Sequence, residues 1–187
     1  MKLYRFDVLA LLVITGVFSA ADSASAATLS SRETIAIKAD PKAVNEDAKV
    51  LWERFGNFCE IAEWHPAVRS CTEGKESGVV YRTLSLEDGG KIKEKLLGLG
   101  ASGYRYAIVE SPLPVKNYEA EFVVTPDKDG VTIVWSASYA ASDGKSDNDA
   151  RSAVDSVLRA GIASIKSKLP DSLKDHVAGK ADAGTKN

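Results

Sequence analysis

Two residues of opposite charge, Arg82 and Glu94, are the first candidates for chemistry, because the sequence around them places them side by side. Residues 79–86 and 91–97 both alternate between apolar and polar side chains and contain many strand-forming residues, which predicts two β-strands. Residues 87–89, Glu-Asp-Gly, suit a three-residue turn that ends in a left-handed glycine. The sequence therefore predicts a hairpin in which Arg82 pairs with Glu94.

The register of this hairpin decides which face carries the charged pair. A two-residue Asp-Gly turn would shift the strands by one position, mix the two faces and oppose like charges, so we reject it. With the three-residue turn, Arg82 and Glu94 share a face with four apolar residues, Val80, Leu84, Ile92 and Leu96. The pair is then either a cross-strand salt bridge at a sheet edge or a polar pair in an apolar cavity, where it could orient a ligand or move a proton.

Glu94 is the leading candidate for a ligand-binding or catalytic group. Burial should raise the pKa of its carboxyl, and Arg82 should oppose that rise. With the pair intact, Glu94 can anchor a ligand hydroxyl; if a ligand displaces Arg82, Glu94 can act as a general base for an enolisation or dehydration. Three tyrosines on neighbouring strands could supply hydroxyl donors, or could be core aromatics whose hydroxyls reach the rim: Tyr106, Tyr118 and Tyr139.

A Trp-His-Pro sequence in the loop before the second predicted strand is another candidate. Trp64 could stack on a ligand and His65 could shuttle a proton at the mouth of a cavity. Alternatively, Trp64 fills the core, Pro66 fixes the turn and His65 is simply exposed. Trp135, on a later strand, is expected in the core or in a cavity wall.

The remaining pattern predicts an α+β fold in which a long helix covers one apolar face of an antiparallel sheet. The helix begins at Ser146 or Asp147 and carries an apolar stripe at helical spacing, and Pro170 ends it. An Asp40-Pro41 start predicts an earlier helix. The other expected elements are strands at 29–38, 68–73, 104–110, 117–125 and 131–139, and a short helix or turn at 58–63.

The composition predicts one domain, and the N-terminal segment predicts that this domain is exported. The chain has 187 residues, of which 44% are apolar and 27% charged, and its formal net charge of −2 gives no reason to expect nucleic acid as a partner. A basic start, an apolar run at 8–14 and Ala-Ser-Ala at 24–26 predict a signal peptide over residues 1–26 rather than a stable membrane anchor. We expect a domain at 27–169, a polar disordered tail at 170–187, and a periplasmic or secreted mature protein.

Export changes the interpretation of the two cysteines, Cys59 and Cys71. An even number of cysteines in an oxidising compartment favours a disulfide over free thiols. The two histidines, His65 and His176, have none of the spacings of metal ligands. Neither a metal site nor a cofactor is expected.

The chain resembles the SRPBCC (START/Bet v 1-like) superfamily, in the branch called polyketide cyclase/dehydrase and lipid transport. The resemblance runs from about Thr28 to Leu169 and implies the helix-grip fold, in which a curved antiparallel sheet of about seven strands wraps around a long C-terminal helix, with two short helices after the first strand. Within that branch, the chain looks like exported bacterial accessory proteins named after the methanol-oxidation cluster. The stretches that carry the resemblance are WHP at 64–66, YRTL at 81–84, EKL at 94–96 and SPLPVKNY at 111–118.

Two groups of plant relatives bear on the charged pair. Lachrymatory factor synthases are similar in using an arginine and a glutamate on adjacent strands for catalysis, which implies such roles for Arg82 and Glu94. Abscisic acid receptors resemble this chain around Glu94 and Tyr118, which implies that both residues line a pocket. Their gate sequence is replaced here by Leu-Glu-Asp-Gly-Gly at 86–90, so gating of the hormone-receptor type is not implied.

Three functions follow as hypotheses. The first is an exported binding protein for a small hydrophobic molecule, lipid- or polyketide-like, held between the sheet and the C-terminal helix. The second is a cyclase, dehydratase or isomerase that uses Glu94 and Arg82. The third is an accessory protein that contacts a periplasmic dehydrogenase or cytochrome. Lys91, Lys93 and Lys95 would suit an acidic partner, but a solvated face is the more ordinary interpretation of these three lysines.

Overall fold

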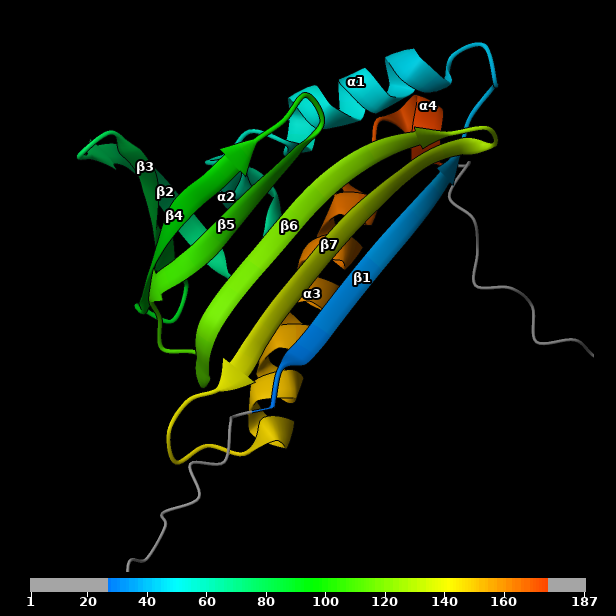
Figure 1. Cartoon of the computed structure of the whole chain (residues 1–187). Coiled ribbons are helices and arrows are strands. Elements are labelled where there is room, and N and C mark those ends of the chain that lie inside the picture. The colour runs from blue at the N-terminus through cyan, green and yellow to red at the C-terminus, as the bar shows by residue number, and fades with distance from the viewer. Residues whose placement is uncertain (1–26, 175–187) are drawn as a thin grey trace, which may run out of the picture.

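The computed structural model describes residues 27–174 and shows one curved, seven-stranded antiparallel sheet wrapped around a long helix (Figure 1). The sheet order is β1-β7-β6-β5-β4-β3-β2. The predicted α+β, helix-grip architecture is confirmed. In chain order the elements are β1 (Leu29–Lys38), α1 (Val44–Phe55), α2 (Ile61–Trp64), β2 (Val68–Glu76), β3 (Val79–Leu86), β4 (Lys91–Leu99), β5 (Gly103–Glu110), β6 (Val115–Asp127), β7 (Gly130–Ala141), α3 (Asp147–Ser167) and α4 (Asp171–Lys174).

The β3–β4 hairpin has the predicted register. Arg82 pairs with Glu94 and Leu84 with Ile92 across the two strands. The turn closes through the backbone N–H of Leu86, which donates to the carbonyl of Gly90 at 2.8 Å. Gly89 has a φ of +89°, a value that residues with a Cβ rarely adopt. The position of this glycine therefore sets which side chains face the core.

Helix α3 covers the concave face of the sheet because it is capped at its start and apolar along one side. The Ser146 hydroxyl accepts the backbone N–H of Asp149 at 3.1 Å, which satisfies one of the free donors at the helix N-terminus. Figure 1 shows α3 running along β1 and β7. The buried stripe consists of Ala150, Val154, Leu158, Gly161, Ile162 and Ile165.

A close approach of α3 to three rings depends on Gly161. A Cβ atom at this position would lie 2.5 Å from the ring of Trp135, 2.9 Å from that of His65 and 3.1 Å from that of Trp64. The first two distances are shorter than a Cβ atom tolerates. Only glycine, which has no Cβ, therefore lets these rings pack directly against the backbone of the helix. The helix and the Trp-His-Pro loop are thereby held together.

Several boundaries differ from the sequence prediction; β2, for example, extends to Glu76 and not to Glu73. Helix α1 begins at Val44 and not directly after Asp40, because residues 41–43 form a separate turn, whose start the Asp40 carboxylate holds by accepting the N–H of Lys42 at 2.8 Å. The short helix lies at Ile61–Trp64, a few residues later than expected. The segment predicted as a disordered tail starts with α4, where Leu173 is buried.

The predicted signal peptide, residues 1–26, and residues 175–187 of the predicted tail lie outside the described part of the chain. In residues 27–174, no helix combines the length and the apolar character that crossing a bilayer requires.

Candidate functional site

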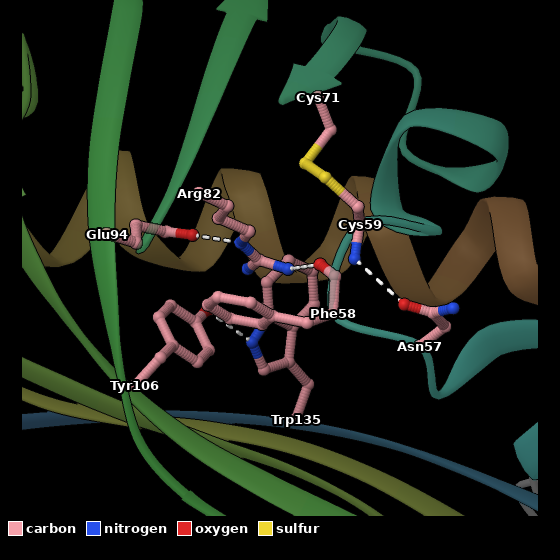
Figure 2. A network of polar contacts seen from close by, with 8 residues as sticks. All are labelled: Asn57, Phe58, Cys59, Cys71, Arg82, Glu94, Tyr106 and Trp135. Atoms are coloured by element: carbon pink, nitrogen blue, oxygen red, sulfur yellow. Dashed lines mark hydrogen bonds and ion pairs between the residues drawn. A yellow bond between two sulfur atoms is a disulfide. The ribbon is translucent and has the colours of Figure 1, made fainter. Parts of the chain in front are cut away.

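Arg82 and Glu94 form a buried ion pair on the covered face of the hairpin (Figure 2). Arg82 Nε donates to Glu94 Oε2 at 2.5 Å, and the exposed fractions of the two residues are 0% and 4%. The prediction that both charges face the core is confirmed. Such a pair loses much hydration energy on burial, so it is weak support for a purely stabilising role.

Aromatic rings surround the guanidinium of Arg82. The Arg82 Cζ atom lies 4.1 Å from the ring centroid of Phe58, 4.9 Å from that of Tyr106 and 5.7 Å from that of Tyr104. Arg82 Nη1 also donates to the backbone carbonyl of Phe58. Ring faces attract a cation, and the effect grows when water is excluded. Sequence reasoning missed Phe58, because a loop carbonyl leaves no periodic signal. It did not single out Tyr104 either, although Tyr104 alternates with Tyr106 on one face of β5.

Burial and charge act in opposite directions on the pair. Burial raises the pKa of Glu94, and the charge of Arg82 opposes that rise, as expected. For Arg82, burial is the largest single influence and lowers the pKa, but the charge and hydrogen bond of Glu94 together with the neighbouring tyrosines exceed it, and the net shift is upward. Arg82 therefore stays charged at any physiological pH, and Glu94 is the member that can exchange a proton.

Two buried nitrogen donors have no hydrogen-bond partner among the described residues. They are Arg82 Nη2 and Trp64 Nε1. A buried donor without an acceptor costs about 1–3 kcal/mol, and more when it carries charge. Native structures contain few such groups, and each calls for an explanation. Both donors are suited to an acceptor oxygen.

The candidate tyrosines form a row of rings across the core. Trp135 Nε1 donates to the Tyr106 hydroxyl at 2.9 Å, so the structure brings these two predicted residues together (Figure 2). The Tyr118 ring lies 6.2 Å from that of Tyr106 and 6.0 Å from that of Tyr139. Burial raises the pKa of Tyr106 and Tyr118 above the ordinary value, so both hydroxyls keep their protons.

The far end of this row is a hydroxyl cluster that the sequence did not reveal. The Tyr139 hydroxyl and the Ser31 hydroxyl are 2.6 Å apart, and Ser31 donates to Asp155 Oδ1 at 2.5 Å. More than a hundred residues separate Ser31 from either partner. Only the pairing of β1 with β7 and the packing of α3 bring them together.

His65 is buried, so the alternative that placed it on the surface is wrong. It is 4% exposed, and its Nδ1 accepts the N–H of Ala67 at 3.1 Å. The Nε2 atom must then carry the hydrogen, which it donates to the Val157 carbonyl at 3.1 Å. Burial lowers the pKa of His65, and the bond to Val157 opposes this only in part. A neutral imidazole with both nitrogens occupied fixes the loop to α3 and is poorly placed to shuttle protons.

Trp64 is 2% exposed and packs between the rings of Phe122 and Trp135. Its ring therefore fills the core, as the simpler alternative for the Trp-His-Pro loop holds. The unpaired Nε1 atom is what keeps Trp64 a candidate for ligand contact.

The charged pair does not line any of five well-formed pockets in residues 27–174. These pockets are lined by other side chains, and Arg82 and Glu94 are 0% and 4% exposed. One is a groove of about 480 Å³ between α1 and the β3–β4 strands, and Phe58 forms part of its wall. Another, of about 450 Å³, reaches Tyr118. The cavity expected beneath the cover helix is thus closed at the charged pair.

Cys59 and Cys71 form the predicted disulfide, with their Cα atoms 5.5 Å apart. The bond joins the α1–α2 loop to β2, next to Phe58 (Figure 2).

The fold and the polar pair in an aromatic core define a START-like protein of the helix-grip class. The model of the family "Polyketide cyclase / dehydrase and lipid transport" matches residues 28–170, and the chain belongs to this family. The predicted superfamily is confirmed. No curated protein matches the chain.

Solved structures share the fold at low sequence identity. XoxI from Bacillus cereus is 22% identical, with a TM-score of 0.63 over 78% of this chain and 96% of that one. The Zhui aromatase/cyclase from Streptomyces sp. R1128 is 13% identical, with a TM-score of 0.53 over 79% and 98%. A START superfamily protein from Mycobacterium smegmatis is 9% identical, with a TM-score of 0.56 over 76% and 96%.

Proposed function

We propose that this protein binds a small, mainly hydrophobic molecule that carries at least one carbonyl or hydroxyl oxygen, with its polar end at Arg82 and Glu94. The observation that carries the proposal is the buried ion pair together with two unpaired donors, Arg82 Nη2 and Trp64 Nε1. A ligand oxygen that accepts from either donor would remove the cost of leaving it unpaired.

The chemistry of the surroundings supports such a ligand. The pair is enclosed by aromatic rings, which offer apolar contact area and a small number of fixed polar atoms, as small-molecule sites usually do. Arg82 can donate to an oxygen through Nη2 without giving up Glu94, and Glu94 Oε2 is already held by Arg82 Nε. Membership of a family named for polyketide cyclases and lipid transport agrees with a ligand of this kind.

A matched double variant tests this proposal. Arg82→Met/Glu94→Leu replaces the pair by apolar residues of similar size, which keeps the packing and removes the polar anchor. The exported wild-type protein is extracted with organic solvent and analysed by mass spectrometry, and both proteins are titrated with the fluorescent probe 1-anilinonaphthalene-8-sulfonate before and after reduction of the disulfide. We expect a retained molecule, or at least tenfold tighter probe binding, in the wild type alone. Equal behaviour of the two folded proteins would refute the proposal.

Glu94 makes an enzyme the second candidate. Because burial raises the pKa of this carboxyl, it is a stronger base than an exposed glutamate once ionised, and it lies in a water-poor site. Removal of a proton next to a ligand carbonyl, with Arg82 stabilising the enolate oxygen, would be the first step of a cyclisation or dehydration. Once the retained molecule is known, Glu94→Gln should keep its affinity and lose turnover by a factor of about 100 or more. Unchanged turnover would contradict a catalytic role for Glu94, and only the binding role would then remain.

The proposal places the protein outside the cytoplasm, after removal of residues 1–26. The disulfide supports this, since such bonds persist mainly in oxidising compartments. Intact mass spectrometry of the periplasmic fraction should give a mature chain that begins near Ala27 or Thr28. A full-length chain confined to the cytoplasm would contradict the export prediction.

A further inference from the structure

A short segment between α1 and α2, residues 57–59, covers the guanidinium of Arg82. The Phe58 ring lies 4.1 Å from Arg82 Cζ, and the Phe58 carbonyl accepts from Arg82 Nη1. Phe58 is 5% exposed. A single residue of a loop thus supplies both a ring and an acceptor to the buried charge (Figure 2).

The other side of Phe58 faces the apolar groove of about 480 Å³ described above. Its walls include Val80 and Leu96, which stand two residues along their strands from Arg82 and Glu94 and on the same face. The groove and the ion pair are therefore neighbours on one surface of the hairpin, and Phe58 stands between them. If Phe58 moved, the groove would extend to the pair.

The disulfide is the covalent restraint on this segment. Cys59 follows Phe58 directly and is joined to Cys71 on β2. Within the segment, the Cys59 N–H bonds only weakly to the Asn57 side chain, at 3.4 Å. Both sulfur-bearing residues are partly exposed, and β2 is an edge strand that pairs with β3 alone. A thiol in solution can therefore approach a bond that holds down the cover of a buried charge.

We propose that the Cys59–Cys71 disulfide is a redox latch that holds Phe58 over Arg82, and that its reduction by a dithiol oxidoreductase opens the groove onto the ion pair. A thiolate of the dithiol attacks one sulfur, so that the Cys59–Cys71 bond breaks and a mixed disulfide forms. The second thiol of the reductant then attacks this mixed disulfide and releases the cysteine of this chain as a thiol. The reductant is oxidised to its own disulfide. Its two electrons and two protons are transferred to this chain, in which Cys59 and Cys71 become two free thiols. The inference deepens the proposed function, since it assigns control of access to the same site.

Hydrogen exchange measured by mass spectrometry tests the latch without any ligand. The oxidised protein is compared with the same protein reduced by dithiothreitol and with the Cys59→Ser/Cys71→Ser variant. We expect exchange of residues 57–62 to accelerate at least tenfold on reduction, with β6, β7 and α3 unchanged. Unchanged exchange of residues 57–62 after full reduction would overturn the proposal. Equal acceleration across the sheet would also overturn it, because the bond would then be a general staple of the fold.

The Phe58→Ala variant supplies a test that keeps the disulfide. In this variant the cover is missing, so 1-anilinonaphthalene-8-sulfonate should bind the oxidised protein as tightly as it binds the reduced wild type, and reduction should add less than twofold. The tyrosine variant Phe58→Tyr is the matched control and should retain the redox response. A redox response in Phe58→Ala as large as in the wild type would show that Phe58 is not the gate.

Different experimental results refute the latch proposal and the binding-site proposal. Unchanged exchange on reduction, combined with probe binding that depends on Arg82, refutes the latch and leaves the proposed function standing. Faster exchange of residues 57–62, with equal probe binding in reduced wild type and reduced Arg82→Met/Glu94→Leu, supports the latch and refutes the ligand site.

Discussion

Two clusters of buried polar groups in residues 27–174 differ in their hydrogen bonding. At one end of the core, Ser31 lies between the Tyr139 hydroxyl and the Asp155 carboxylate. At the other end, Arg82 and Glu94 bind each other, but Arg82 Nη2 has no acceptor among the described residues. Ser31 and Tyr139 lie on β1 and β7, and Arg82 and Glu94 lie on β3 and β4 of the same sheet.

This difference separates a structural cluster from the proposed binding site. A buried polar network with every member paired stabilises one packing arrangement, whereas a partly paired network is destabilising unless something else completes it. The Ser31 cluster can be explained by the fold alone. The Arg82 cluster costs the fold free energy, and a ligand oxygen would explain why it persists. Variants at the two ends should therefore behave differently.

The largest effect is expected from breaking the ion pair. Glu94→Leu leaves Arg82 charged and buried without its partner, which should lower the free energy of unfolding by about 3–5 kcal/mol. Urea denaturation followed by circular dichroism measures the change. Arg82→Met/Glu94→Leu should lie within about 1 kcal/mol of the wild type, because no unpaired charge remains. A double variant as unstable as the single one would show that the pair itself stabilises the fold.

A smaller effect is expected at the opposite end. Ser31→Ala leaves the Tyr139 hydroxyl and the Asp155 carboxylate without their shared partner, and should cost about 1–3 kcal/mol of unfolding free energy. Binding of 1-anilinonaphthalene-8-sulfonate should stay within twofold of the wild type. Loss of probe binding in folded Ser31→Ala would remove the distinction between the two clusters.

The smallest effect concerns pH. The pKa of His65 is lowered in the folded state, so the unfolded chain binds a proton more readily as the pH falls. The stability that His65 contributes is therefore complete above its ordinary pKa of 6.5 and is lost as the pH falls through the lowered folded-state value. Between pH 7 and 5, wild-type stability should fall more steeply than that of His65→Gln. Parallel urea midpoints for the two proteins would contradict this assignment.

The sequence was sufficient for the features that depend on local pattern. The glycine at position 89 fixed the hairpin register, and from it the burial of Arg82 and Glu94 followed. The apolar stripe after Ser146 gave the cover helix. These features depend on residues only a few positions apart, where turn chemistry and periodicity act directly.

The features that the sequence could not give depend on loops and on distant contacts. The Phe58 carbonyl is a backbone group, and any residue there would supply one, so nothing marks it as the partner of Arg82. The burial of His65 follows from two backbone groups that happen to satisfy both ring nitrogens. Asp40 looked like a helix cap because the side chain that caps a helix can equally close a turn.

Gly161 has a mechanical consequence for any ligand that enters this fold. Because three rings rest on its bare backbone, these rings set how closely α3 approaches the sheet at this point. A methyl group placed there by Gly161→Ala would act as a wedge between helix and rings. It would offer a way to prop the protein open permanently while leaving Arg82, Glu94 and the disulfide untouched.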